Sequence, residues 1–200
     1  MTRQNKVSLE KLLQEVRGCR ACEAYLPLGP RPILQISGSA RILIVGQAPG
    51  IAVHRTGIPW NDPSGKTLRA WMGVDEAVFY DARRIAIIPM GYCYPGRGKS
   101  GDLPPRRECA ELWLDKLLEY LRDIELTLLI GQYAQRHFLA SRRKASLTET
   151  VRSWQDYGPD LLPLPHPSPR NRGWLKRNPW FESELLPAMR GRITEVLGCG

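Results

Sequence analysis

The stretch that most constrains the fold is a short apolar run followed by a loop rich in glycine and proline. The run is Ile42 to Val45, and the loop occupies residues 46–50 with the sequence Gly-Gln-Ala-Pro-Gly. A short apolar run bounded by turn residues is typical of a buried parallel strand. Proline lacks an N–H and glycine permits positive φ, so regular structure ends there. We therefore predict a loop at the carboxyl end of a strand, where open α/β sheets bind ligands.

The chain then returns toward this loop through an aromatic residue and a carboxylate. Trp60 is followed by Asn61, Asp62 and Pro63. An Asp directly before a Pro is typical of a helix N-cap with proline at the first helical position. A strand end, an aromatic ring and a carboxylate thus converge on a small space, which predicts an active site.

The remaining chain alternates apolar segments with amphipathic ones. Further strands are predicted at 84–88, 126–130 and 161–164. Helices are predicted at 8–17, 64–72, 75–80, 106–122, 133–139 and 179–197. Alternating strands and helices are typical of a parallel sheet covered on both faces. We predict an α/β fold, a three-layer αβα sandwich with a central, mostly parallel four-stranded sheet, formed by a single domain over residues 1–200.

The net charge and the hydropathy of the chain indicate which kinds of partner it can bind. The 200 residues carry a formal net charge of +9 and a sequence pI near 9.6. Such a balance favours a polyanion such as nucleic acid, because Lys and Arg that neutralise phosphates release counterions. No apolar run approaches the roughly 18 residues of a membrane span, and the polar start lacks the apolar stretch of a signal peptide. We expect a cytoplasmic monomer with no membrane association.

Four cysteines form a pattern typical of metal ligation. Cys19 and Cys22 form a two-ligand clip, Cys93 follows the second predicted strand, and Cys109 lies in the next helix. In a reducing compartment such cysteines are thiolate ligands more often than disulfides. Four thiolates suit either a zinc site or a four-iron cluster. Cys109 has an alternative reading as a buried core residue. Cys199, near the end of the chain, is expected to be uninvolved.

Two motifs together resemble a known family. The loop 46–50 after a strand and the segment His166-Pro-Ser-Pro near the end of the chain resemble the uracil-DNA glycosylase superfamily. The cysteine spacing and the segment 55–65 are similar to its iron–sulfur bacterial and archaeal branches, families four and five. The resemblance spans about residues 15 to 190. It implies a DNA base-excision repair enzyme that carries a [4Fe-4S] cluster, with zinc as the alternative.

The resemblance also implies roles for individual residues. His166 would hydrogen-bond the leaving base, Trp60 would stack on it, and Asp62 would be the catalytic carboxylate. The expected base-binding set is Gly46, Gln47, Ala48, Gly50, Trp60 and Asn61. The expected cluster ligands are Cys19, Cys22, Cys93 and Cys109.

The chain departs from the family pattern at two positions. Ala48 stands where the best-known branch has its water-activating aspartate. Asp62 falls near the aspartate that family five uses instead, one residue short in the count. Pro89 stands where the family has a base-reading asparagine, so uracil selection through that amide is lost. For Asp62, the sequence leaves open both a catalytic role and a helix-capping role.

The segment after His166 interleaves basic and aromatic residues, which suits phosphate contacts and a wedge into the base stack. The expected DNA-binding residues are Ser168, Arg170, Asn171, Arg172 and Trp174. The loop 95–101 and residues 142–144 are further candidates for phosphate contacts.

The leading hypothesis is a monofunctional DNA glycosylase, a hydrolase acting on N-glycosyl bonds, that flips out uracil or another deaminated base. Because position 48 lacks a carboxylate, a non-catalytic or covalent binder of damaged DNA on the same fold is one alternative. A zinc-stabilised nucleic-acid-binding module is the other.

Overall fold

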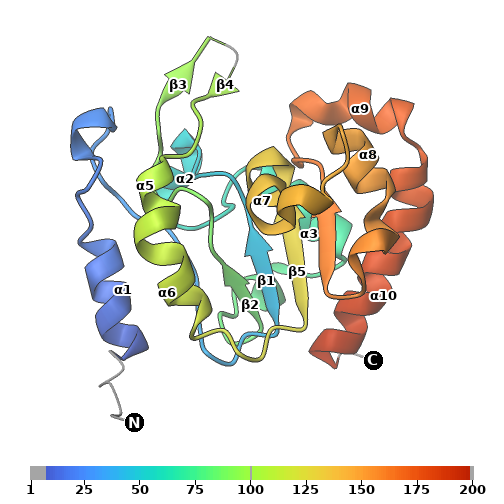
Figure 1. Ribbon diagram of the computed structural model, residues 1–200, viewed down its shortest axis with the longest axis horizontal. Coiled ribbons are helices and arrows are strands. Elements are labelled where there is room, and N and C mark those ends of the chain that lie inside the picture. Colours follow the sequence, from blue (N-terminus) through green and yellow to red (C-terminus); the bar gives the residue numbers. More distant parts are fainter. Residues whose placement is uncertain (1–7, 100, 199–200) are drawn as a thin grey trace.

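The fold is built on a four-stranded parallel sheet, seen in a computed structural model that describes residues 8–99 and 101–198. Its strands are β1 (Ile42–Val45), β2 (Ile85–Ile87), β5 (Leu126–Ile130) and β6 (Leu161–Leu164). They pair in the order β2-β1-β5-β6 (Figure 1). Every pair is parallel, with Ile42 opposite both Ile85 and Leu126. The predicted α/β fold with a parallel sheet is therefore confirmed.

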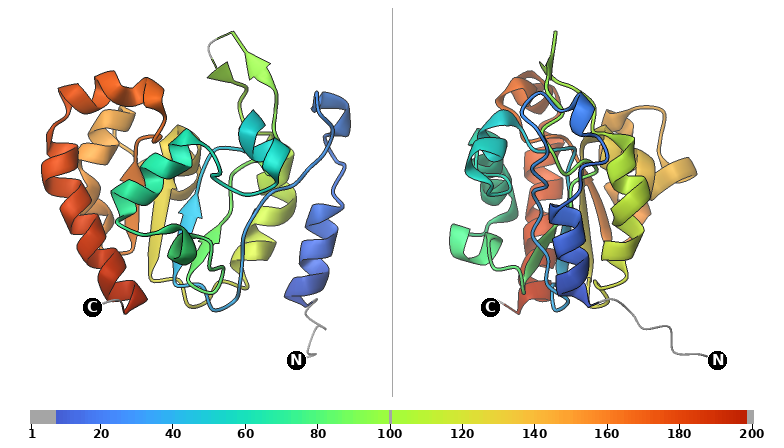
Figure 2. Two further views of the ribbon diagram at one scale, coloured as in Figure 1. Left: turned by 180° about the vertical axis from the view of Figure 1, so that it is seen from behind. Right: turned by 90° about the vertical axis from the view of Figure 1, so that its left-hand side faces the viewer.

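Helices cover both faces of this sheet, which gives three layers (Figure 2). The helices are α1 (Leu9–Arg17), α2 (Ile51–Thr56), α3 (Pro63–Met72), α4 (Glu76–Phe79), α5 (Arg107–Cys109), α6 (Asp115–Leu118), α7 (Gly131–Leu139), α8 (Leu147–Arg152), α9 (Arg172–Arg177) and α10 (Leu186–Leu197). Alternate residues of a strand point to opposite faces. Leu43 and Val45 accordingly join the core beneath α1, α6 and α7, whereas Ile42 and Ile44 join the core beneath α3 and α10.

Local sequence signals set several helix ends as predicted. The Ser8 hydroxyl accepts a hydrogen bond from the backbone N–H of Lys11 at 3.2 Å and begins α1. Asp62 caps α3 in the same way. Gly73 ends α3 in the left-handed conformation with φ of 70°, which glycine adopts without steric cost.

The structure differs from the sequence prediction in places where long-range packing overrides local pattern. Residues expected as a loop at 95–103 include an antiparallel pair, β3 (Arg97–Gly98) and β4 (Gly101–Asp102). The predicted helix at 106–122 spans 107–118 and contains a π-helical turn at 110–114. The C-terminal helix predicted from 179 begins as a π-helical turn at 181–185. Short helices α2, α8 and α9 were not predicted.

The polypeptide places its polar loops at one edge of the sheet. The carboxyl ends of the strands point toward the top of Figure 1, where α2 and the β3–β4 pair also lie. Among the described residues, no helix is long and apolar enough to cross a membrane.

Candidate active site

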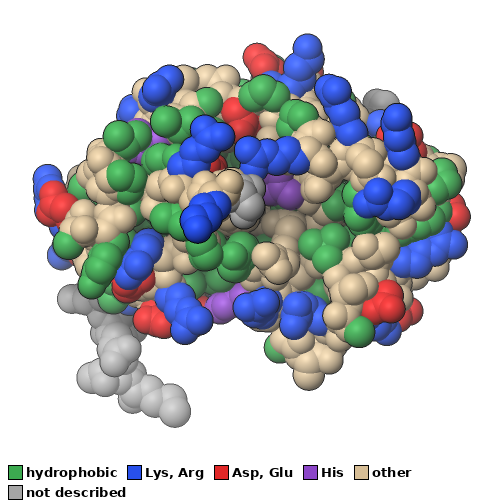
Figure 3. Space-filling model, turned by 90° about the horizontal axis from the view of Figure 1, so that it is seen from above, with side chains coloured by type: hydrophobic (Ala, Val, Ile, Leu, Met, Phe, Trp, Pro, Cys, Tyr) green, Lys and Arg blue, Asp and Glu red, His purple; other side chains and the backbone are tan. Residues whose placement is uncertain are grey.

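A cavity of about 450 Å³ opens at the carboxyl edge of the sheet, a size typical of small-molecule sites. It lies between the loop that follows β1 and the segment that follows β6. The predicted site residues that line it are Gly46, Gln47, Ala48, Gly50, Trp60, Asp62, His166, Ser168 and Arg170. The other predicted residues, Asn61, Asn171, Arg172 and Trp174, are not among its lining residues. From above, Lys and Arg side chains lie around a hollow in which a histidine is visible (Figure 3).

The two predicted motifs meet in this cavity through an aromatic pair. The rings of Trp60 and His166 have centroids 5.6 Å apart and are tilted by 35°. Trp60 has φ of 57°, a strained conformation for a residue with a side chain. Gly65 makes this geometry possible, because a Cβ there would lie 1.7 Å from the Trp60 carbonyl oxygen. The turn before α3 thus holds the indole against the cavity.

Asp62 combines both roles that the sequence left open for it. Its carboxylate accepts a hydrogen bond from the backbone N–H of Gly65 at 2.8 Å, which caps α3. It also lines the cavity and lies near His166. Burial lowers the pKa of His166 below its ordinary 6.5, and the negative charge of Asp62 partly opposes this shift. The imidazole is therefore held neutral at neutral pH, suited to hydrogen bonding with a ligand.

The loop after β1 is held in place by backbone hydrogen bonds from the loop after β2. The N–H of Met90 donates to the Gly46 carbonyl, and the N–H of Gly91 donates to the Gln47 carbonyl, both at 2.9 Å. The Gln47 side-chain amide donates to the Leu103 carbonyl at 3.3 Å. Pro89 lines the cavity as well, at the position where the resembling family has an asparagine. This wall of the cavity therefore offers fixed backbone groups and a proline ring.

Sequence reasoning missed one carboxylate of the cavity. Asp102, in β4, lines it together with Gly101. Forty residues of chain separate Asp102 from Asp62, so no local motif connects them. The sequence did draw attention to residues 95–103 through their Gly- and Lys-rich composition. That composition favoured a loop that contacts phosphates, not a carboxylate in the cavity.

The segment after His166 is ordered by its own polar side chains. The Asn171 amide donates to the His166 carbonyl at 2.7 Å, and the Ser168 hydroxyl accepts from the N–H of Arg170 at 3.3 Å. Trp174 instead packs against Trp180 and Phe181, and its indole N–H donates to Thr148 at 2.8 Å. Among the basic and aromatic residues of this segment, Arg170 is the one that reaches the cavity.

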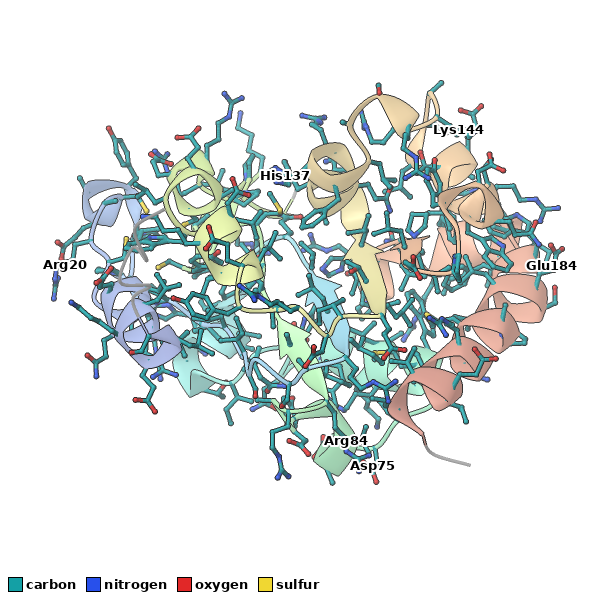
Figure 4. All side chains as sticks on the ribbon, turned by 60° about the horizontal axis from the view of Figure 1, so that its bottom comes forward. Arg20, Asp75, Arg84, His137, Lys144 and Glu184 are labelled. Atoms are coloured by element: carbon teal, nitrogen blue, oxygen red, sulfur yellow. The ribbon has the colours of Figure 1, made fainter. Side chains whose placement is uncertain are left out.

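The other predicted phosphate contact, residues 142–144, makes internal interactions. Lys144 forms an ion pair with Asp156 at 2.7 Å. The guanidinium of Arg142 lies 5.3 Å from the centre of the Tyr157 ring and donates to the Asp156 carbonyl. These contacts tie the segment before α8 to the segment after it. In Figure 4, Lys144 lies at the outside of the molecule.

The four predicted cysteine ligands come from three separate segments and influence one another electrostatically. Cys22, Cys93 and Cys109 are buried, and Cys19 is half-buried. Burial, together with the charges of the other three cysteines, raises the pKa of Cys109 to about 12. Burial likewise raises the pKa of Cys93 to about 11, with contributions from Cys22 and Cys19. All four thiols therefore lie within interaction range of one another.

Hydrogen-bond donors and outward-pointing charges surround this cysteine group (Cys19, Cys22, Cys93 and Cys109). The indole N–H of Trp113 donates to the Cys19 sulfur at 3.3 Å. Arg20, in the clip, points outward (Figure 4) and pairs with Glu23 at 2.6 Å. Within residues 8–99 and 101–198, no three His, Cys, Asp or Glu side chains are placed to hold a single metal ion. Four neighbouring thiols are a donor set of the kind that iron–sulfur clusters and zinc sites use. Cys199 lies outside the described residues.

Fold and cavity together define an α/β protein with an aromatic, polar pocket at the carboxyl ends of its strands, bordered by basic side chains. A family model described as the uracil DNA glycosylase superfamily matches residues 35–190. The chain belongs to the uracil DNA glycosylase superfamily, and its function is uracil-DNA-glycosylase-like. The match covers both the loop after β1 and the segment with His166, the two motifs that face each other across the cavity.

Proposed function

We propose that this protein is a monofunctional DNA glycosylase that excises uracil or another deaminated base by hydrolysis. The observation that carries the proposal is the meeting of Trp60 and His166 in a cavity that Asp62 also lines. A stacking surface, a neutral hydrogen-bonding group and a carboxylate are the groups that base excision requires.

Binding begins with extrusion of the nucleotide, which costs a few kcal/mol of stacking and pairing. Arg170 lines the cavity, and we propose that it would contact the strand and fill the gap left by the base. The exposed Arg172, Lys176 and Arg177 on and beside α9 would add phosphate contacts. Phosphate neutralisation of this kind makes binding strongly dependent on salt. We expect the protein to act as a monomer.

The flipped base would stack on Trp60 and present its edge to His166. Stacking tolerates any base, since every base has a π-face. Because Pro89 offers no side-chain amide, selection rests on backbone groups of the loop 46–50 and on His166. This arrangement supports a deaminated base in general rather than uracil alone.

Excision breaks the bond between C1′ of the sugar and the base nitrogen, and the electron pair leaves with the base. The sugar becomes cationic and the base anionic, so the catalyst must stabilise both charges. His166, held neutral, would donate a hydrogen bond to the base carbonyl that gains charge. Asp62 would stabilise the cation or orient the water whose oxygen adds to C1′, and the proton of that water is lost to solvent or to the base.

We also propose that Cys19, Cys22, Cys93 and Cys109 hold a [4Fe-4S] cluster, as in families four and five of the superfamily. None of the four cysteines is among the residues that line the cavity, and the group is proposed to be structural. Its four mutually interacting thiols and the Trp113 N–H bond to Cys19 support this assignment. A cluster supplies positive charge that stabilises thiolates, which burial alone disfavours. Zinc is the alternative, and metal analysis distinguishes iron from zinc.

The test is incubation of the purified holoprotein with labelled oligonucleotides carrying uracil, hypoxanthine or xanthine, single- and double-stranded. An abasic product from at least one of them is expected. Absence of product from all of them, together with tight binding to the damaged strands, would instead support the damaged-DNA binder. That second candidate is favoured by one observation, the lack of a carboxylate at Ala48 in the loop after β1.

A further inference from the structure

The β3–β4 hairpin forms one wall of the cavity and is joined to the loop after β1 at two points. Gly98 pairs with Gly101, and Arg97 pairs with Asp102. The Gln47 amide donates to the carbonyl of Leu103, directly after the hairpin. A Cβ on Gly50 would lie 3.5 Å from the Asp102 carboxylate, so that carboxylate lies against the loop. The hairpin therefore places a second carboxylate in the cavity.

The surroundings of Asp102 set its charge. Burial raises the pKa of its carboxyl group, the charges of Arg170 and Arg97 lower it, and the charge of Asp62 raises it again. Gly101 lets Arg170 approach, since a Cβ there would lie 2.7 Å from its guanidinium. Asp102 and Arg170 therefore lie together at the rim, and Asp62 is near enough for the two carboxylates to repel.

The carboxylates of Asp62 and Asp102 lie at different depths in the cavity. Asp102 and Arg170 are exposed, whereas Asp62 and His166 are half-buried, and it is Asp62 that affects the pKa of His166. A flipped base enters such a cavity ahead of its sugar, because the sugar remains attached to the strand. Groups at the rim therefore face the sugar, His166 faces the base, and Asp62, whose charge acts on both Asp102 and His166, stays near the bond that breaks.

The geometry points to Asp102 as a second carboxylate, in addition to Asp62, that faces the deoxyribose and stabilises its positive charge during excision. This inference rests on the proposed glycosylase function and adds a residue to it. A rim carboxylate repels DNA phosphates, so it weakens binding of ordinary DNA while stabilising a cationic sugar. A residue with a merely structural role would not both weaken the binding of ordinary DNA and stabilise a cationic sugar.

The experiment measures single-turnover excision and DNA binding for the wild type and for Asp102→Asn. The variant is expected to excise every accepted base more slowly by a similar factor of about 100. It should bind undamaged duplex as tightly as the wild type or more tightly. The wild type should prefer duplex with a cationic pyrrolidine abasic analogue over the neutral tetrahydrofuran analogue, and Asp102→Asn should lose that preference. Asp102→Glu, which keeps the charge, should retain it.

Asp123→Asn is the matched control, because Asp123 is exposed and precedes β5 at the opposite edge of the sheet. It should leave rates and preferences unchanged. The inference is overturned if Asp102→Asn excises at the wild-type rate, if it slows only one base, or if the wild type shows no preference for the cationic analogue. If the wild type excises no base, the proposed function fails and the catalytic role of Asp102 fails with it, and a preference for the cationic analogue that depends on Asp102 would then support only its position beside the sugar of bound DNA.

Discussion

The cavity and the cysteine group differ in how their polar groups are placed relative to water. In the cavity, Asp62 and His166 are half-buried and open toward solvent beside an aromatic surface. In the cysteine group, three of four thiols are buried among the hydrophobic residues packed around α1 and α6. We propose that the cavity groups meet a ligand and therefore stay accessible, and that the cysteine group holds structure and is therefore removed from water. Damage to one region should therefore affect chemistry, and damage to the other should affect folding.

The largest expected effect follows from loss of a cysteine ligand. Cys109→Ser should abolish the visible absorbance of an iron–sulfur cluster and lower the free energy of unfolding by about 4 kcal/mol or more. Absorbance spectra, iron analysis and thermal unfolding measure both effects. Cys199→Ser, which removes a thiol outside the predicted set, should behave like the wild type. Full absorbance in Cys109→Ser would remove that residue from the ligand set.

The substitution in the cavity that we compare with Cys109→Ser is His166→Asn. We expect single-turnover excision to fall about 100-fold, since a donor to a developing anion is worth that much. Stability should change far less than in Cys109→Ser, because the imidazole is only half-buried. The control is His137→Asn, an exposed position on α7. A stability loss as large as that of the cysteine variant would break the distinction between the two regions.

A backbone change sharpens the comparison by testing how rigidly the cavity is built. Gly65→Ala would place a Cβ 1.7 Å from the Trp60 carbonyl oxygen. The turn must shift, and we expect a loss of about 1–3 kcal/mol in unfolding free energy together with slower excision. Gly191→Ala, where a Cβ on α10 meets nothing within 4 Å, should be neutral or gain about 0.5–1 kcal/mol. Equal behaviour of the two variants would show that the turn is not constrained.

The smallest effect is a dependence of stability on pH near the cavity. Burial lowers the pKa of His54 and of His166 below 6.5, and Arg31 also lowers that of His54. Below pH 6.5 the unfolded chain therefore binds more protons than the folded one. Stability should be full above that pH and fall as the pH drops toward the folded values.

Thermal unfolding at about pH 7 and about pH 5 measures this loss. His54→Gln should show less of it than the wild type, because the Nδ1 atom of His54 is buried without a hydrogen-bond partner. His137→Gln, at an exposed position, should show the full loss. If His54→Gln loses as much stability between the two pH values as the wild type, groups other than His54 cause the pH dependence.

Local sequence patterns predicted the parallel sheet and several helix ends. The strands 126–130 and 161–164 match the structure because short apolar runs bounded by turns have few alternatives. Ser8 and Asp62 were recognisable as caps because capping requires only the neighbouring backbone N–H groups. The hairpin at 97–102 was missed, since its two-residue strands have too little sequence to form a pattern. The sequence also did not indicate that Trp174, a predicted DNA-binding residue, packs against Trp180 and Phe181.

The sequence by itself determined that the loop after β1 and the segment of His166 each follow a strand, because such motifs depend on residues adjacent in the chain. Only the tertiary structure decided that Trp60 and His166 face each other, that Asp62 serves as a cap and lines the cavity, and that Asp102 joins them. These relations cross the sheet between segments up to about a hundred residues apart. The packing of the strands brings these segments together. The spacing of residues within one segment carries no information about that packing.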